Sequence, residues 1–199
     1  MSLMHRRDLL KQGARLALAG AVASSQRVAQ AESGGTRNGV ELTALSAQQS
    51  DEGVLLSYAV RFDLSRELEQ ALTRGVAVVF VAQAELLRSR WYWADQSRGV
   101  ATRRWRLGYQ PLTRQWRLNV DGLSRHFTQL GDALDVVRRG SRWRIADAVA
   151  AGDEAEHYVE FSFKLDTDEL PRPLQIGLGT PLGWDLSVQR RIHLAPAGR

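Results

Sequence analysis

Residues 54–62 read Val-Leu-Leu-Ser-Tyr-Ala-Val-Arg-Phe, and this stretch decides the fold class. Every second side chain from Val54 to Phe62 is large and apolar, whereas the residues between them include Ser57 and Arg61. Successive side chains of a strand point to opposite faces, so one face of this segment is expected in a core. The two-residue period therefore predicts a half-buried β-strand.

The same pattern recurs along the chain, with turn residues between the segments. Residues 76–84 are apolar on both faces, which predicts a central strand covered on both sides. Turns are expected at residues 48–53, 95–99 and 121–122. The other expected strands start at Val40 or cover residues 88–93, 102–109, 112–120, 142–146, 157–165, 174–178 and 184–194.

Two segments have the spacing of short helices. Ser65 is expected to cap a helix over residues 66–74 that Gly75 ends. Thr128 is expected to cap a second helix, which starts near Leu130 and is ended by Gly140. About nine strands and two short helices predict a mainly β fold, an antiparallel β-sandwich with the helices on its ends or edges.

The chain has 199 residues, 44% of them apolar, and no cysteine. This length suits one sandwich domain, expected over residues 40–194, with a flexible leader at 32–39 and a tail at 195–199. The missing cysteines exclude disulfides, thiolate metal sites and iron–sulfur clusters, and no cofactor is expected. No apolar run is long enough for a transmembrane span in the mature protein.

Residues 1–31 have the layout of a cleavable bacterial signal peptide. Arg6, Arg7 and Lys11 resemble a twin-arginine motif, and a weakly apolar run of small residues follows. Ala29 and Ala31 form an A-x-A cleavage site. The segment predicts export to the periplasm, by the twin-arginine or the general route.

The mature chain would be almost neutral, with 22 basic and 21 acidic groups. This balance argues against a nucleic-acid partner. Charge is nevertheless segregated: residues 88–144 carry thirteen arginines and four aspartates, whereas both flanks are acidic. The middle segment could form a basic surface for anionic lipid headgroups, polysaccharide or an acidic partner. We favour the alternative, in which its arginines form ion pairs with the acidic flanks across neighbouring strands.

Recognisable catalytic motifs are missing from the sequence. There is no nucleophile elbow, Walker loop or dinucleotide fingerprint. The histidines of the mature chain, His126, His157 and His193, lack metal-ligand spacing, so no metal site is expected. The acidic turn would support a hydrolase only if Asp166, Asp168 or Glu169 lay within about 10 Å of a shared cleft.

Tryptophan and arginine alternate in several segments. Trp91 and Trp93 are expected on one strand face, and exposed rows of such rings can stack on sugars. The alternative is a tryptophan core with arginine side chains lying along it. The candidate binding surface comprises Trp91, Trp93, Arg104, Arg106, Trp116 and Arg117.

Residues 109–118, Tyr-Gln-Pro-Leu-Thr-Arg-Gln-Trp-Arg-Leu, resemble a proteobacterial family defined by the domain of unknown function 4390. The stretch 90–93, Arg-Trp-Tyr-Trp, and the stretch 165–171 with Leu-Asp and Glu-Leu-Pro resemble it as well. The resemblance covers about residues 40–194 and implies an exported protein. It also implies a periplasmic protein partner, the sensor domain of a membrane kinase.

Together these features favour a periplasmic, non-catalytic interaction module. A carbohydrate- or envelope-polymer-binding module that uses the Trp/Arg strand faces is the alternative. An envelope hydrolase is the third hypothesis, and it rests on the unpaired acids and histidines alone.

Overall fold

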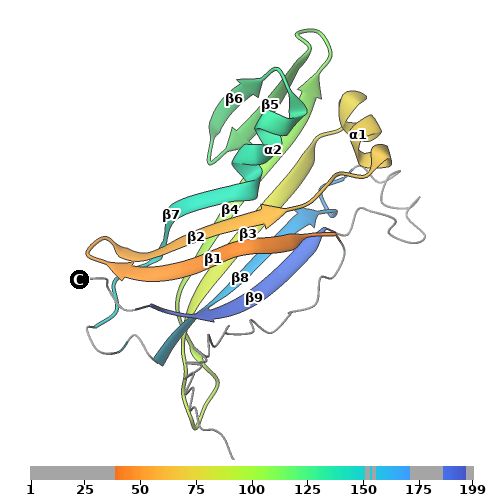
Figure 1. The fold of residues 1–199 in the computed structure, drawn as a ribbon. Coiled ribbons are helices and arrows are strands. Elements are labelled where there is room, and N and C mark those ends of the chain that lie inside the picture. Colours follow the sequence, from red (N-terminus) through yellow and green to blue (C-terminus); the bar gives the residue numbers. More distant parts are fainter. Residues whose placement is uncertain (1–38, 151–152, 154–155, 171–185, 196–199) are drawn as a thin grey trace, which may run out of the picture. The chain divides into compact units, whose positions relative to one another are not determined.

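In the computed structural model, which describes residues 39–150, 153, 156–170 and 186–195, strands dominate the chain (Figure 1). The described residues form nine strands and two helices. In chain order these are β1 (Glu41–Ser50), β2 (Gly53–Arg61), α1 (Arg66–Thr73), β3 (Val78–Arg88), β4 (Gln96–Gln110), β5 (Gln115–Val120), β6 (Leu123–Phe127), α2 (Leu130–Arg138), β7 (Arg139–Ala146), β8 (His157–Asp166) and β9 (Ser187–His193).

The strands form two antiparallel sheets, as the alternation of side chains predicts. A three-stranded sheet has the order β1-β2-β7, and a six-stranded sheet has the order β6-β5-β4-β3-β8-β9. Every pairing inside the sheets is antiparallel. The mainly β, sandwich-like fold with two helices is therefore confirmed.

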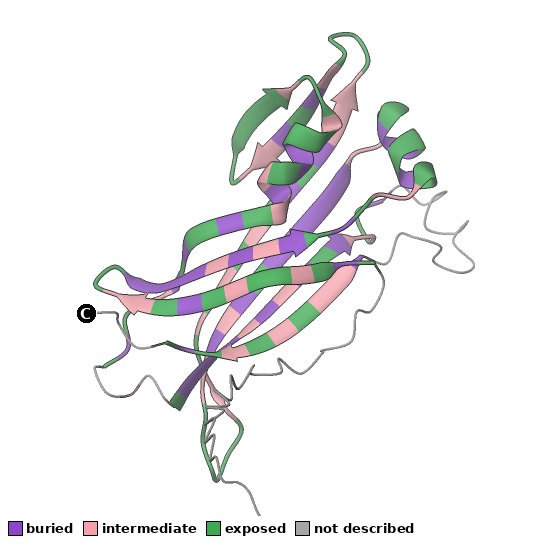
Figure 2. Cartoon of the chain, in the orientation of Figure 1, coloured by how far each residue is buried: buried purple, intermediate pink, exposed green. Residues whose placement is uncertain are grey.

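The core lies between the sheets, and buried residues lie along most of the strands but not along the edge strand β6 (Figure 2). The predicted face of β2 is buried from Val54 to Val60, and Phe62 behind it is buried as well. Both faces of β3 are covered, because Phe80 and Ala82 are buried on one side and Val79 and Val81 on the other. Phe163 of β8 lies at the centre and contacts aromatic rings from both sheets, those of Tyr58, Phe62, Phe80 and Trp105.

The two sheets also meet along their margins. Gln48 of β1 forms a parallel bridge with Ala195, which follows β9, and the Ala195 amide donates to the Ala47 carbonyl at 3.0 Å. On the other margin, a β-carbon added to Gly99 of β4 would lie 2.8 Å from the Ala146 side chain of β7. Glycine is therefore required at position 99, because the two backbones approach too closely for a side chain.

The two helices begin and end differently from each other. Ser65 caps α1 as predicted, since its hydroxyl accepts a hydrogen bond from the Leu68 amide at 3.2 Å. Thr128 does not cap α2: the N-cap is Gln129, which makes no side-chain capping bond. Gly140 does not end α2 either, because β7 starts directly at Arg139 and Gly140 lies in that strand against the Tyr58 ring.

Four local expectations about strands need correction. Residues 89–93 are not a strand, because β3 ends at Arg88 and a loop leads to β4. The turn expected at 95–99 is already β4, which starts at Gln96. Residues 111–114 form a turn in which Arg114 has φ 53°, so β5 starts at Gln115. The edge strand β6 was not expected.

Several expectations fall outside the described residues. These are the signal peptide, nearly all of the leader, the strand over 174–178 and the end of the tail. No helix within the described part of the chain is both long and apolar enough to cross a bilayer.

Candidate functional site

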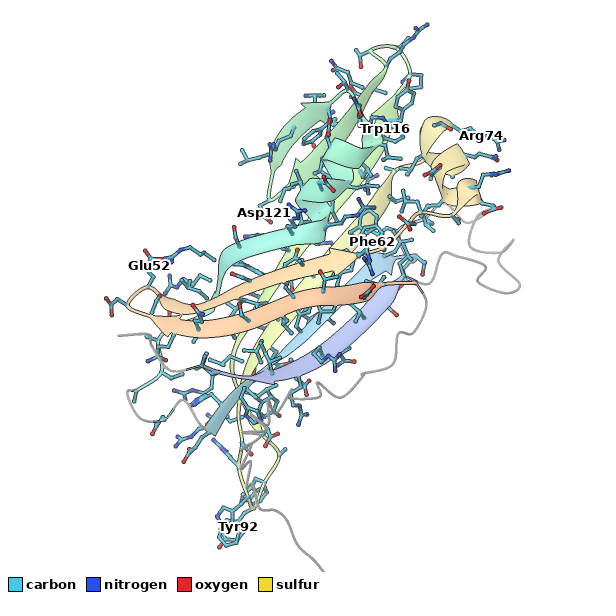
Figure 3. The ribbon with its side chains drawn as sticks, viewed as in Figure 1. Glu52, Phe62, Arg74, Tyr92, Trp116 and Asp121 are labelled. Atoms are coloured by element: carbon cyan, nitrogen blue, oxygen red, sulfur yellow. The ribbon has the colours of Figure 1, made fainter. Side chains whose placement is uncertain are left out.

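Residues 89–95 connect β3 to β4, and we call them the aromatic loop. The side chains of Trp91, Tyr92 and Trp93 are 84%, 69% and 81% exposed. Tyr92 marks the end of this long hairpin in Figure 3. Three adjacent large aromatic side chains in solvent are unusual, because such residues normally fill cores, and contiguous exposed apolar groups mark interaction sites.

The two ends of the loop are held by hydrogen bonds. The Asp95 carboxylate accepts a bond from the Arg90 amide at 3.1 Å and another from the Tyr158 hydroxyl of β8. The Ser89 amide donates to the Glu156 carbonyl at 2.8 Å. The loop backbone is thus tied to itself and to the neighbouring strand, while the three rings remain in solvent.

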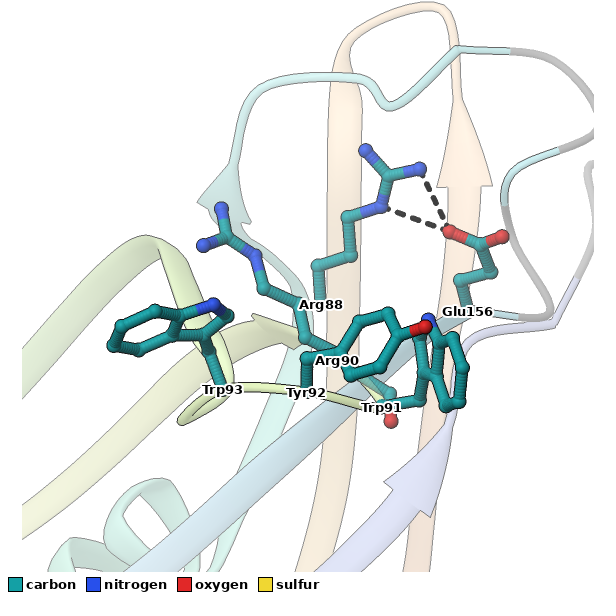
Figure 4. Close-up of a pocket in the computed structure, with 7 residues that line it drawn as sticks. Arg88, Arg90, Trp91, Tyr92, Trp93 and Glu156 are labelled. Atoms are coloured by element: carbon teal, nitrogen blue, oxygen red, sulfur yellow. Dashed lines mark hydrogen bonds and ion pairs between the residues drawn. The ribbon is translucent and has the colours of Figure 1, made fainter.

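A shallow depression lies beside the rings (Figure 4). On one wall the Arg88 guanidinium pairs with the Glu156 carboxylate at 2.7 Å and reaches Asp153 at 3.7 Å. The His157 ring lies next to this wall, is 2% exposed, and has Nδ1 2.7 Å from the Asp153 carbonyl. Among the described residues its Nε2 has no hydrogen-bond partner.

The Asp95–Tyr158 hydrogen bond makes the base of the loop sensitive to pH. The bond raises the pKa of Tyr158 to about 12 and lowers the pKa of Asp95. A raised tyrosine pKa stabilises the folded protein below about pH 10 and loses this effect as pH rises through 12. The lowered Asp95 pKa stabilises the fold above about pH 4 and loses its effect at lower pH.

We therefore expect Asp95→Asn to bring the pKa of Tyr158 down from about 12 towards 10. Tyrosinate absorbance during an alkaline titration measures this change. The Tyr158→Phe variant assigns the transition, because burial also raises the pKa of Tyr58. A transition that stays near pH 12 in Asp95→Asn would contradict the assigned contact.

The structure does not bring the six residues of the candidate binding surface together. Trp91 and Trp93 lie in the aromatic loop, whereas Arg104 lies eight residues along β4 from Gln96, about 27 Å at roughly 3.4 Å per residue. Trp116 is buried in the core against Tyr109. The tryptophans in the described ranges fall into two groups: Trp105, Trp116 and Trp143 are core residues, and Trp91 and Trp93 are exposed.

The three arginines of that surface lie on the outer face of the six-stranded sheet. Arg104 pairs with Asp166 at 3.1 Å and with Glu169 at 2.5 Å, and Arg106 reaches Glu169 at 3.5 Å. Arg117 instead donates to Asn119 and Ser124. Asp166 and Glu169 therefore converge on one guanidinium.

The fold brings the segregated charges of the sequence together, but not across neighbouring strands as expected, because most of the acidic partners lie in turns and loops and β3 separates Arg104 of β4 from Asp166 of β8. Arginines of the middle segment pair with carboxylates of both acidic flanks, and the pairs in which both side chains are exposed each contribute little to stability. The pairs between them among the described residues are Arg88–Asp153, Arg88–Glu156, Arg104–Asp166, Arg104–Glu169, Arg106–Glu169, Arg138–Asp63, Arg142–Glu52 and Arg144–Asp147.

The histidines that the structure describes lie on three different strands, His126 on β6, His157 on β8 and His193 on β9. No group of three metal-ligating side chains gathers anywhere in the described ranges. The backbone amide of Asp168 donates a hydrogen bond to the Asp166 carboxylate at 3.3 Å.

Sequence reasoning did not identify the groups that hold the aromatic loop. Asp95 was assigned to a turn and Tyr158 to an ordinary strand position, and their contact depends on the pairing of β3 with β8. The only available signal was the run of three aromatics itself, directly before an aspartate.

Comparison with known proteins gives one finding. A family model described as "Domain of unknown function (DUF4390)" matches residues 37–193. No curated protein and no solved structure matches the chain.

Proposed function

Because the chain belongs to the DUF4390 family through residues 37–193, we propose that this domain is an exported, non-catalytic binding module. Its binding element is the aromatic loop. The single observation that carries this proposal is the exposure of Trp91, Tyr92 and Trp93 on a loop with a fixed base.

The fixed base supports a binding role for the loop. A contact element that is already ordered loses little conformational entropy when it binds, so more of the contact energy remains as affinity. The rings themselves supply large amphipathic surfaces, of the kind enriched at binding sites.

The proposed location follows from the N-terminal segment. Arg6, Arg7 and Lys11 direct the chain out of the cytoplasm, and cleavage follows Ala31. In the periplasm the module would face the outer domain of a membrane-bound partner, and the resemblance to the family points to the sensor domain of a kinase.

The missing cysteines provide a direct test in cells. A single cysteine in place of Tyr92 reports on the aromatic loop, and one in place of Leu112, which is fully exposed on the β4–β5 turn, is the matched control. We expect a membrane-impermeant maleimide to label both purified variants. In cells with a permeabilised outer membrane it should label Leu112→Cys but not Tyr92→Cys.

Equal labelling of both positions in cells would overturn the binding role of the loop.

Export is tested separately with Arg6→Lys/Arg7→Lys, which should retain the protein in the cytosol if the twin-arginine route is used. N-terminal sequencing of the native protein should start at Glu32, and a start at Met1 would contradict export.

A further inference from the structure

We infer that the aromatic loop binds the surface of a phospholipid bilayer, with its three aromatic rings at the level of the lipid headgroups. This inference rests on the proposed function for the location of the protein and adds the class of surface that is bound. Four observations on the described residues support it.

The first observation is the chemistry of the rings. Tryptophan and tyrosine combine an apolar body with one polar hydrogen-bonding group, and they are enriched where hydrocarbon meets water at membranes. Trp91, Tyr92 and Trp93 are consecutive, and each exposes more than two thirds of its surface. No aliphatic side chain accompanies them in the loop apart from Ala94.

The second observation is the shape of the site. Tyr92 lies at the end of a hairpin (Figure 3), and the three aromatic residues line only a shallow, open depression. A bilayer surface needs no deep complementary cavity. At about 150–250 Å² per aromatic side chain, the three rings offer roughly 350–600 Å². That is less than the ~800 Å² per partner of a stable protein interface, but it suits shallow insertion.

The third observation concerns the ring faces. Trp91 and Tyr92 lie against each other at an interplanar angle of 41°, and Trp93 points to the other side (Figure 4). Sugar stacking needs free ring faces, and this contact covers part of two of them. Insertion among lipid headgroups uses ring edges and faces alike.

The fourth observation is charge near the loop. The Arg88 guanidinium forms an ion pair with the Glu156 carboxylate, which neutralises its charge. The Arg90 guanidinium instead donates a hydrogen bond to the uncharged side-chain amide of Gln96. Arg98 lies just beyond the loop, in a bulge of β4 opposite Leu86 and Leu87. Neither Arg90 nor Arg98 has a carboxylate partner among the described residues, so both can approach lipid phosphates.

The test is co-flotation of the purified full chain with vesicles of phosphatidylcholine alone and of phosphatidylcholine mixed with phosphatidylglycerol. We expect binding to both, stronger to the anionic vesicles, together with a blue shift of tryptophan fluorescence. Trp91→Ala/Trp93→Ala should weaken binding by about tenfold or more. The control Leu112→Ala/Leu123→Ala, which removes two exposed apolar side chains away from the loop, should bind as the wild type does. Arg90→Ala/Arg98→Ala should abolish the preference for anionic vesicles.

Binding that is unchanged in Trp91→Ala/Trp93→Ala would overturn the inference, because it would then come from elsewhere, such as the basic N-terminal segment. A flat response to both vesicle types would also overturn it. If Tyr92→Cys is protected in cells but the vesicles give no response, the inference fails while the binding role stands. A fluorescence response to peptidoglycan fragments alone would assign the loop to a glycan instead.

Discussion

Replacing Phe163 by alanine should lower the free energy of unfolding by about 3–5 kcal/mol, the range typical of a buried aromatic ring truncated to alanine. The Phe163 ring is fully buried on β8 and contacts Phe62 at 5.6 Å and Phe80 at 6.1 Å between centroids. It also contacts Tyr58 from the opposite sheet and Trp105 from β4. Alanine would leave a cavity lined by four rings that cannot collapse without moving both sheets.

Urea unfolding measures this loss. Phe163→Leu keeps most of the volume and should cost less, within about 1.5 kcal/mol. The matched control is Trp93→Ala, which removes a larger ring from the aromatic loop and should change stability by less than about 0.5 kcal/mol. Similar losses in Phe163→Ala and Trp93→Ala would mean that the division into core and exposed aromatics is wrong.

Gly140→Ala should destabilise the protein by about 1–3 kcal/mol through a steric clash. A β-carbon at this position of β7 would lie 2.2 Å from Cε1 and 2.8 Å from Cδ1 of Tyr58. The Tyr58 ring cannot move away easily, because Phe161 lies 4.8 Å from it on the other sheet. The methyl group must therefore displace either the ring or β7.

Gly131→Ala is the control for the glycine substitution. Nothing lies within 4 Å of a β-carbon at position 131, and this residue is inside α2, so alanine should be neutral or stabilising by up to about 1 kcal/mol. In a Tyr58→Leu background, Gly140→Ala should cost measurably less, with a coupling energy of about 0.5–3 kcal/mol. Additive losses would show that the clash with Tyr58 is not the cause.

Much of the sheet structure was predictable from the sequence, because burial of one strand face imposes a two-residue period. The alternation over residues 54–62 and 157–165 located β2 and β8 to within a residue at each end. β6 was missed because Leu123–Phe127 is short, mostly exposed and at the edge of its sheet. A strand without a buried face carries no such period.

The aromatic loop could not be located as a loop from the same signal. Residues 88–93 combine arginine with aromatic side chains, as residues 103–106 do, yet Trp105 is buried and Trp91 is exposed. The difference depends on where the β3–β4 hairpin turns, which is set by the pairing of both strands with their neighbours. Sequence therefore identified the aromatics as the notable residues without deciding which ones meet solvent.

The bridge between Gln48 and Ala195 has a consequence for how the protein acquires its structure during synthesis. The two residues are 147 positions apart, and the central pairing of β3 with β8 joins residues 69 to 87 positions apart. Folds dominated by such distant contacts form slowly. A ribosome must therefore release nearly the whole domain before its two layers can close, and the growing chain is exposed until then to chaperones and proteases.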